Sequence, residues 1–212
     1  MPFDLYVITD ETLSGGIPHV GIARRAIEGG ADAIQLRDKA LPGRDLVRIG
    51  REIASITKPS GAIFIVNDRL DVALSCGADG VHLGQGDISP GVARQLAPPG
   101  FIIGVSVGSI EEAMAAEAEG ADYVALSPTF ATGSKADAGP GLGLDRLRKI
   151  RCAVRIPVIA IGGIGPANVR DVIRAGADGV AVISAVVSAP DIREAARGMK
   201  ARIRQAKTET LL

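Results

Sequence analysis

Short apolar runs alternate with longer amphipathic segments along the whole chain. The amphipathic segments carry apolar residues at a spacing close to 3.6, which predicts helices at 20–28, 45–56, 110–119 and 167–175. The apolar runs are rich in Val, Ile and Leu, and they predict eight strands at 5–9, 33–39, 63–68, 80–85, 102–107, 123–128, 158–162 and 180–184. Strands that alternate with helices predict an α/β protein with a parallel sheet.

The tripeptide Gly-Ala-Asp recurs four times, each time immediately before every second predicted strand. Its copies are residues 30–32, 77–79, 120–122 and 176–178. A glycine at such a position is typical of a helix end, where it takes the left-handed conformation. Four repeats of a double unit predict a closed (β/α)8 TIM barrel. The alternative fold is an open doubly wound sheet.

Length and composition fit one barrel domain over residues 1–212. The chain is shorter than the roughly 250 residues typical of this fold, but it is long enough to bury a large core. Hydrophobic residues make up 47% of it, aromatic residues only 3%, and Trp is absent, so the core must consist of small aliphatic side chains. We expect residues 193–207, which are rich in Arg and Lys, to form the solvated face of a last helix. Residues from about 206 to 212 are expected to form a disordered tail.

The balanced charge argues against nucleic-acid and anionic-membrane partners, and neither a membrane span nor a signal peptide is recognisable in the sequence. Lys plus Arg and Asp plus Glu each number 24, so the overall field favours neither nucleic acid nor an anionic membrane. No apolar run reaches the roughly 18 residues of a membrane span, and residues 1–4 do not resemble a signal peptide. Cys76 and Cys152 lack metal-binding spacing and are expected to be reduced thiols. We expect a cytoplasmic protein that acts on small molecules, and its assembly into a homo-oligomer is left open.

The segment 35–39 places charge where a barrel has its active site. Residues two apart on a strand share a face, so Gln35, Arg37 and Lys39 are expected to point into the barrel while Ile34 and Leu36 face the helices. Cations in a barrel mouth need anions, because an unpaired buried charge is costly. The segment therefore predicts an anion site.

Two carboxylates follow neighbouring predicted strands. Asp68 comes directly after Asn67 at the end of the third strand, and Asp87 follows the fourth. Adjacent strand ends lie about 5 Å apart, so both carboxylates could reach one ion. Mg²⁺ is usually held by one or two carboxylates together with substrate phosphates and water. The alternative is that Asp68 and Asp87 are only N-caps of the following helices.

Two glycine-rich segments near the carboxyl ends of later strands also suggest ligand contacts. The loop at 130–143 contains Thr132, Ser134 and Lys135, which could close over an anion, although a flexible surface loop has the same composition. The seventh strand ends in glycines that include Gly163, and the eighth ends at Ile183 and Ser184. Backbone amides in these positions predict a second phosphate site.

Three other polar residues are expected to have structural roles. His82 lies within a strand and is interpreted as a hydrogen-bonded core histidine. His19 is expected on the surface near the start of the first helix. Asp10, at the end of the first strand, is expected to orient or cap the loop that follows.

The ordered set of motifs resembles the thiamine phosphate synthase family. The resemblance runs from about residue 5 to residue 188 and rests on residues 5–10, 35–39, 67–68, 82–87, 104–106, 132–135, 161–164 and 183–185. It implies a Mg²⁺-dependent transferase of thiamine biosynthesis. Such an enzyme joins 4-amino-2-methyl-5-hydroxymethylpyrimidine diphosphate to a thiazole phosphate, or to its carboxylated form, and releases pyrophosphate and thiamine phosphate.

The resemblance also implies roles for individual residues. It places the metal ion on Asp68 and Asp87, and the catalytic charge on Arg37, Lys39 and Lys135, with Ser106 near the pyrimidine. Substrate contacts are implied for Gln35, Leu36, Arg37, Asp38, Lys39, Asn67, Ser106, Thr132, Ser134, Lys135, Gly163, Ile183 and Ser184. No nucleophilic residue or general base is required if the substrate ionises to a stabilised pyrimidine cation, as the resemblance implies.

Two other functions are compatible with a barrel of this kind. A thiazole tautomerase of similar fold would act on the same thiazole phosphate but would need neither a diphosphate site nor a metal. A non-catalytic barrel could bind a phosphorylated ligand for storage or regulation. Gly108 supports the second alternative, since the family usually has His at this position.

Overall fold

Eight strands occupy the positions predicted from the sequence. The computed structural model describes residues 3–134 and 139–210. Its strands are β1 (Leu5–Ile8), β2 (Ala33–Leu36), β3 (Ile63–Asn67), β4 (Gly80–Leu83), β5 (Ile102–Val107), β6 (Tyr123–Leu126), β7 (Val158–Ile161) and β8 (Gly179–Val182). Most strands end earlier than predicted, because the polar residues at their carboxyl ends turn into the loops of the barrel mouth.

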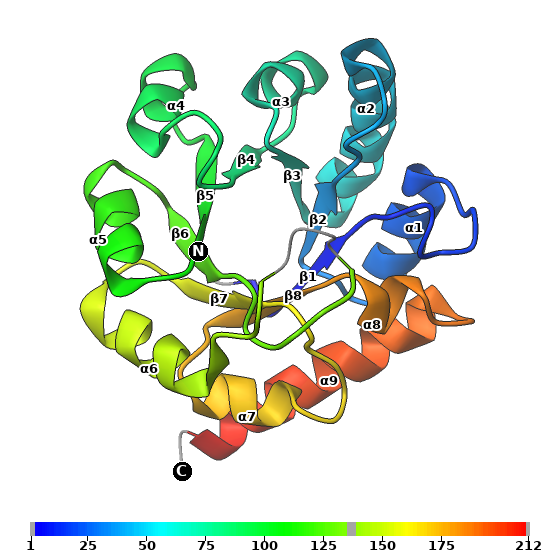
Figure 1. Ribbon diagram of the computed structural model, residues 1–212. Helices are drawn as coiled ribbons and strands as arrows, with labels where there is room; N and C mark the ends of the chain where they lie inside the picture. Colours follow the sequence, from blue (N-terminus) through cyan, green and yellow to red (C-terminus); the bar gives the residue numbers. More distant parts are fainter. Residues whose placement is uncertain (1–2, 135–138, 211–212) are drawn as a thin grey trace.

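Helices follow the strands and surround them (Figure 1). They are α1 (His19–Glu28), α2 (Gly43–Ser60), α3 (Leu70–Cys76), α4 (Pro90–Leu96), α5 (Ile110–Ala118), α6 (Gly143–Ala153), α7 (Val169–Arg174), α8 (Ser184–Val187) and α9 (Ile192–Thr210). Among residues 3–134 and 139–210, no helix is long and apolar enough to cross a membrane.

The sheet closes on itself. Each strand pairs in parallel with the next, and β8 pairs with β1, where Leu5 lies opposite Val180 and Val7 opposite Val182. Closure excludes the open doubly wound sheet and confirms the (β/α)8 barrel.

The Gly-Ala-Asp repeat supports the barrel at its amino-terminal end. Its glycines all have positive φ angles, as predicted for helix ends: Gly30 (93°), Gly77 (74°), Gly120 (90°) and Gly176 (102°). Each aspartate also accepts a hydrogen bond from a backbone N–H at the start of the preceding strand. The pairs are Asp32 with Leu5, Asp79 with Phe64, Asp122 with Ile103 and Asp178 with Val158, at 2.7–2.9 Å. The repeat therefore ties successive strands together opposite the barrel mouth.

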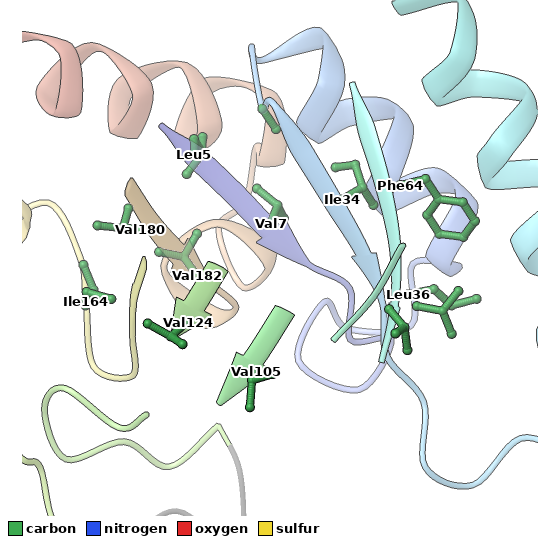
Figure 2. Close-up of a cluster of buried hydrophobic side chains, with 14 of the residues drawn as sticks. Leu5, Val7, Ile34, Leu36, Phe64, Val105, Val124, Ile164, Val180 and Val182 are labelled. Atoms are coloured by element: carbon green, nitrogen blue, oxygen red, sulfur yellow. The ribbon is translucent and has the colours of Figure 1, made fainter. Parts of the chain in front are cut away.

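Alternate residues of each strand pack into two separate hydrophobic cores. Leu5 and Val7 of β1 face the helices, as do Ile34 and Leu36 of β2 (Figure 2). The intervening residues fill the barrel interior, which holds Phe3, Tyr6, Ile8, Ala33, Ile65, Ile102, Tyr123, Ala125, Ile159, Ile161, Ala181 and Ile183. A two-residue period of this kind is expected for parallel strands covered by helices.

Helix α9 differs from its prediction in two ways. It packs against α7 and α1 and continues to Thr210, so most of the expected tail is helical. Its cations are also not all solvated. Lys200 is buried and pairs with Asp32 and, at 2.8 Å, with Asp4, while Lys207 binds Asp4 at 2.6 Å. Burial of the Lys200 stem is compatible with its charge because both carboxylates accept from the same ammonium.

Candidate active site

A cavity of about 430 Å³ opens at the carboxyl ends of the strands. Loops from β2 through β8 contribute to it, so residues distant in sequence share one space. Its polar and charged lining includes Arg37, Lys39, Asn67, Asp68, His82, Gln85, Asp87, Ser106, Ser127, Thr132, Ser134 and Ser184. Active sites of this fold occupy this end of the barrel.

The β2 segment contributes its cations but not its other predicted ligands. Arg37 and Lys39 line the cavity from the loop beyond β2. Gln35 does point inward, as predicted, but it lies within the barrel and its Nε2 donates to Tyr6 Oη at 2.6 Å. Leu36 packs in the outer core, and Asp38 Oδ1 accepts from the Ala40 and Leu41 amides. The side chains of Gln35, Leu36 and Asp38 are therefore not part of the cavity lining.

His19 is buried, so its predicted surface position is wrong. The residue is 1% exposed; its Nδ1 lies 2.7 Å from Thr9 Oγ1 and its Nε2 lies 3.3 Å from Asp38 Oδ2. Burial acts to raise the pKa of Asp38, but hydrogen bonds from the Leu41 and Ala40 amides and from His19 hold that pKa below its ordinary value. These bonds fix the loop that carries Arg37 and Lys39. Partners distant along the chain bury His19, and no local pattern shows them.

The carboxyl groups of Asp68 and Asp87 lie close enough to interact electrostatically. Burial and the neighbouring Asp87 carboxylate raise the pKa of Asp68 to about 6, while Lys39 and Arg37 act in the opposite direction. Two carboxylates that face one another favour a proton or a cation between them. Asp68 also has a φ of 61°, which is uncommon outside glycine. Its amide donates to the His82 carbonyl at 2.8 Å, and this bond helps to hold the left-handed conformation.

Neither aspartate caps the helix that follows it, so the capping alternative is wrong. The N-cap of α3 is Arg69, and that of α4 is Ser89. Asp87 instead closes a turn, where its Oδ2 accepts from the Gly84 N–H at 2.7 Å. Asp10, in contrast, does accept from the Leu13 amide at 2.9 Å, as expected of a capping residue.

Ser106 is held from two sides on the floor of the cavity. Its hydroxyl lies 2.9 Å from His82 Nε2, and its carbonyl accepts from Gln85 Nε2 at 2.7 Å. His82 also contacts Tyr123 Oη through Nδ1 at 2.9 Å, so its interpretation as a hydrogen-bonded core histidine is confirmed. It additionally lines the cavity, which its position within a strand did not reveal.

The loop after β6 is anchored at its start against the end of β7, and its far end bonds back to that start. The Thr129 and Phe130 amides donate to the Ile161 and Gly162 carbonyls at 2.7 and 3.0 Å, and the Gly143 amide donates back to Thr129. Thr132 and Ser134 of this loop line the cavity. Lys135 falls outside the described residues, and closure of the loop over a ligand stays a prediction.

The remaining wall, the backbone wall, consists of glycines and of small or apolar residues at the ends of β7 and β8. Gly162 and Gly163 have φ angles of 99° and 63°, and a Cβ on Gly163 would lie 2.6 Å from the Ala131 carbonyl oxygen. Ile183 and Ser184 continue this wall, and Ser134 Oγ meets Ser184 Oγ at 3.2 Å. This side of the cavity carries no charged side chain among the described residues. It therefore differs from the side that holds Arg37, Lys39 and the two aspartates.

Sequence reasoning missed several cavity residues near the strand ends. Most are small or apolar, and they are Gly84, Gly86, Ser127, Pro128, Gly139, Ala181 and Val182. Ser127 and Pro128, joined by a cis peptide bond, directly follow β6. Their place at a strand end was the available signal, since the first residues after a barrel strand reach the mouth.

A closed (β/α)8 barrel with a polar and charged cavity at the carboxyl ends of its strands is the architecture of TIM-barrel enzymes. The thiamine monophosphate synthase family matches residues 5–186, and the chain belongs to that family. Relatives named thiamine-phosphate synthase include one from Methanoculleus marisnigri, 64% identical over 99% of both chains. Another, from Methanoregula boonei, is 63% identical over 99% of this chain and 97% of its own.

Solved structures agree with this assignment. A thiamine phosphate pyrophosphorylase from Pyrococcus furiosus superposes with a TM-score of 0.89 at 47% identity, over 96% of each chain. A 3-hexulose-6-phosphate synthase superposes with a TM-score of 0.69 at 21% identity, over 94% of this chain and 99% of its own. The second likeness shows the shared barrel fold alone.

Proposed function

We propose that this chain joins the aminopyrimidine diphosphate to the thiazole phosphate, or to its carboxylated form, giving thiamine phosphate and pyrophosphate. The observation that carries the proposal is the two-sided cavity in a member of this family. Arg37, Lys39, Asp68 and Asp87 line one side, and a wall of backbone and hydroxyl groups lines the other. Two phosphorylated substrates of different charge fit these two sides.

The donor set fits Mg²⁺. Asp68 and Asp87 share a region in which burial and mutual repulsion favour a bound cation, as the raised pKa of Asp68 indicates. Residues 3–134 and 139–210 contain no cluster of three or more His, Cys, Asp or Glu that could enclose a metal. Mg²⁺ needs no such cluster, because substrate phosphates and water complete its coordination. When bound by these two aspartates, the ion would neutralise part of the diphosphate charge.

Arg37 and Lys39 are assigned to the diphosphate. Negative charge localises on this group as its bond to the methylene carbon breaks, and fixed cations aimed at developing charge are commonly a large catalytic contribution. Lys135 is proposed for the same role. Asn67 lies beside Asp68 on the cavity wall and is assigned to the same substrate. Gln35, Leu36 and Asp38 are proposed to act through their backbone and through the shape of the loop.

The backbone wall is assigned to the thiazole phosphate. Gly163, Ile183 and Ser184 line it, and a residue with a side chain at 163 would meet the Ala131 carbonyl. Thr132 and Ser134 offer hydroxyl groups to the same substrate, while Ser106 faces the pyrimidine. Transfer then needs no nucleophilic side chain if the pyrimidine cation forms before the thiazole nitrogen attacks.

The test is to incubate each substrate alone and both together, with Mg²⁺ or with a chelator. The proposal predicts that thiamine phosphate and pyrophosphate form only with both substrates and the metal. Conversion of the thiazole phosphate alone, insensitive to chelator, would instead identify a tautomerase. Cytoplasmic location stays a prediction of the sequence, and assembly into a homo-oligomer stays open.

A further inference from the structure

Large apolar side chains are exposed on one arc of the helix ring. Within residues 3–134 and 139–210, the exposed large hydrophobic residues are Leu74 on α3, Ile88 before α4, Val92 and Leu96 on α4, and Met114 on α5. Leu96 has the greatest exposed fraction among them, 63%. Figure 1 shows α3, α4 and α5 as successive helices of this arc. Single exposed apolar residues are normal on a protein surface, but a group of them on neighbouring elements marks an interaction site.

Leu74 lies on the side of α3 that faces α4. The opposite side of α3 faces α2, because Asp71, Val72 and Ser75 line a surface groove together with residues of α2. Successive residues of a helix are about 100° apart, so Leu74, two positions after Val72, points about 160° away from it. Leu74 is therefore directed outward and toward α4.

Val92 and Leu96 lie on the side of α4 that faces α3. Arg94 marks the opposite side, since its Nη2 donates to the Gly120 carbonyl at 2.8 Å and to Asp122 Oδ2 at 2.6 Å, both just beyond α5. Val92 and Leu96 are each two positions from Arg94 and one turn from each other. They therefore share the flank of α4 that points away from α5.

The facing flanks of α3 and α4 are not packed against each other. Helix α2 packs against α3, and α5 packs against α6, whereas α3 and α4 make few contacts with one another. Leu74, Val92 and Leu96 consequently stay exposed, although they lie on flanks that face each other. These three residues are called the α3–α4 patch.

The helices on the two sides of the α3–α4 patch carry opposite charge. On one side, α2 holds four cations and two carboxylates in residues 43–60, and its Arg44, Arg48 and Arg51 are exposed. On the other side, residues 110–119, which are α5 and its C-cap, hold four glutamates and no cation. Along the arc from α2 to α5 the surface therefore changes from basic through apolar to acidic.

We propose that the α3–α4 patch is the centre of a homodimer interface whose two-fold axis runs parallel to the helices, between α3 and α4. Such an axis brings α3 of each copy to α4 of the other, and it places basic α2 on the side of acidic α5. An axis across the helices would instead place α2 with α2 and α5 with α5, so like charges would repel. Because the charge order complements its own two-fold copy, the partner that this surface fits is a second copy of the chain. The apolar centre supplies the contact, and the flanking charges steer the encounter and set its orientation.

Sedimentation velocity of the full, ligand-free chain over a concentration series tests the interface. We expect a dimer, and we expect Leu96→Asp and Val92→Asp each to weaken it by more than about tenfold, because each buries an unpaired charge at the centre. Both residues are exposed, so the fold of the single chain should survive, as far-UV circular dichroism can show. Met114→Asp is the matched control and should dimerise like the wild type. Met114 is also exposed, but it lies one turn from Glu117, whose carboxylate binds backbone amides after α6, and so it points away from α4. A wild type that is monomeric at every concentration overturns the proposal and leaves the patch to a different partner. A dimer that both α4 variants keep, or that Met114→Asp also loses, overturns it as well.

The salt dependence of the dimer tests the direction of the two-fold axis. With α2 on the side of α5, screening should weaken the attraction, so the dimer Kd should rise from low salt to about 1 M salt, where the Debye length is about 3 Å. The double change Arg44→Glu and Arg48→Glu reverses the net charge of α2 and should raise the Kd at low salt, and high salt should reduce its difference from the wild type. A wild-type Kd that falls or stays constant as salt is added contradicts the proposed axis. These measurements involve no substrate, so their outcome is independent of the proposed activity.

Discussion

At the scale of single residues, Asp68 combines an unfavourable backbone conformation with an unfavourable charge environment. Its φ of 61° is sterically unfavourable for a residue other than glycine, and its contact with a second carboxylate is unfavourable in the absence of a cation or a proton. Features of this kind persist where the surroundings enforce them, and they often mark functional sites. In Asp68 the backbone strain and the charge repulsion fall on one residue, which is the residue assigned to the metal.

The raised pKa of Asp68 predicts a pH dependence of stability in chelator-containing buffer. The pKa is about 6 in the folded chain against an ordinary 3.8, so the folded state holds a proton that the unfolded state releases between these values. The contribution to stability is full below pH 3.8 and is lost as the pH rises through 6. Asp68→Asn, in which Asn tolerates the left-handed backbone, should remove this loss and raise the free energy of unfolding at pH 7.5 by about 1 kcal/mol after allowance for solvent screening.

Urea denaturation at several pH values measures this effect. Mg²⁺ should raise the melting temperature of the wild type and leave that of Asp68→Asn unchanged, because ligand binding to the folded state alone stabilises it. Equal pH profiles for the two proteins would contradict the assignment of the raised pKa. An equal response to Mg²⁺ would contradict the metal site.

At the scale of elements, the loop between β2 and α2 depends on the start of α1. His19, the first residue of that helix, joins Thr9 after β1 to Asp38 in the loop. Asp38 in turn accepts the amides of Ala40 and Leu41. A buried imidazole therefore supports the segment from which Arg37 and Lys39 reach the cavity.

His19→Ala should loosen this loop without removing a cavity residue. We expect the KM for the pyrimidine diphosphate to rise about tenfold, equivalent to about 1.4 kcal/mol of lost binding, while the KM for the thiazole phosphate stays unchanged. Arg24→Ala, an exposed change on the same helix, is the control and should alter neither value. An equal rise in both KM values for His19→Ala would indicate general damage to the barrel instead.

The aspartates of the Gly-Ala-Asp repeat have a structural role at the opposite end. Asp122 accepts from the Ile103 amide at 2.7 Å and pairs with Arg94 at 2.6 Å. Asp122→Ala should lower the free energy of unfolding by about 1–2 kcal/mol, because a backbone amide loses its partner. Activity per folded molecule should stay at the wild-type level, since this end of the barrel carries no chemistry. Asp145→Ala, an exposed change on α6, is the control for denaturation, and reduced kcat in Asp122→Ala would contradict this division.

The sequence predicted elements well because their signals are local. Alternation along β1 and β2 and the glycines of the repeat each depend on a few neighbouring residues. The burial of His19 and the depth of Gln35 depend on partners far along the chain, Asp38 and Tyr6. The face of the strand on which each side chain lies therefore followed from the pattern. The height of each side chain along the barrel axis did not.

At the scale of the whole molecule, the proposed function places two kinds of anion site in one cavity. The loops after β2, β3 and β4 bring side-chain charge, and the ends of β7 and β8 bring backbone and hydroxyl groups. Under the proposed function, ligand binding at the charged site depends on an ion and on the protonation of Asp68, whereas binding at the backbone wall depends on neither. Two substrates can then bind on opposite sides and react between them.

Isothermal titration calorimetry with pyrophosphate and with the thiazole phosphate tests this central claim most directly. We predict that removal of Mg²⁺, or the change Asp68→Asn, weakens pyrophosphate binding at least about tenfold, as expected for loss of a charge-assisted contact. The thiazole phosphate should bind with the same affinity in every case, and it should still bind when pyrophosphate and Mg²⁺ are present at saturation. Competition between the two ligands, or an equal dependence of both on the metal, would contradict the two-sided site.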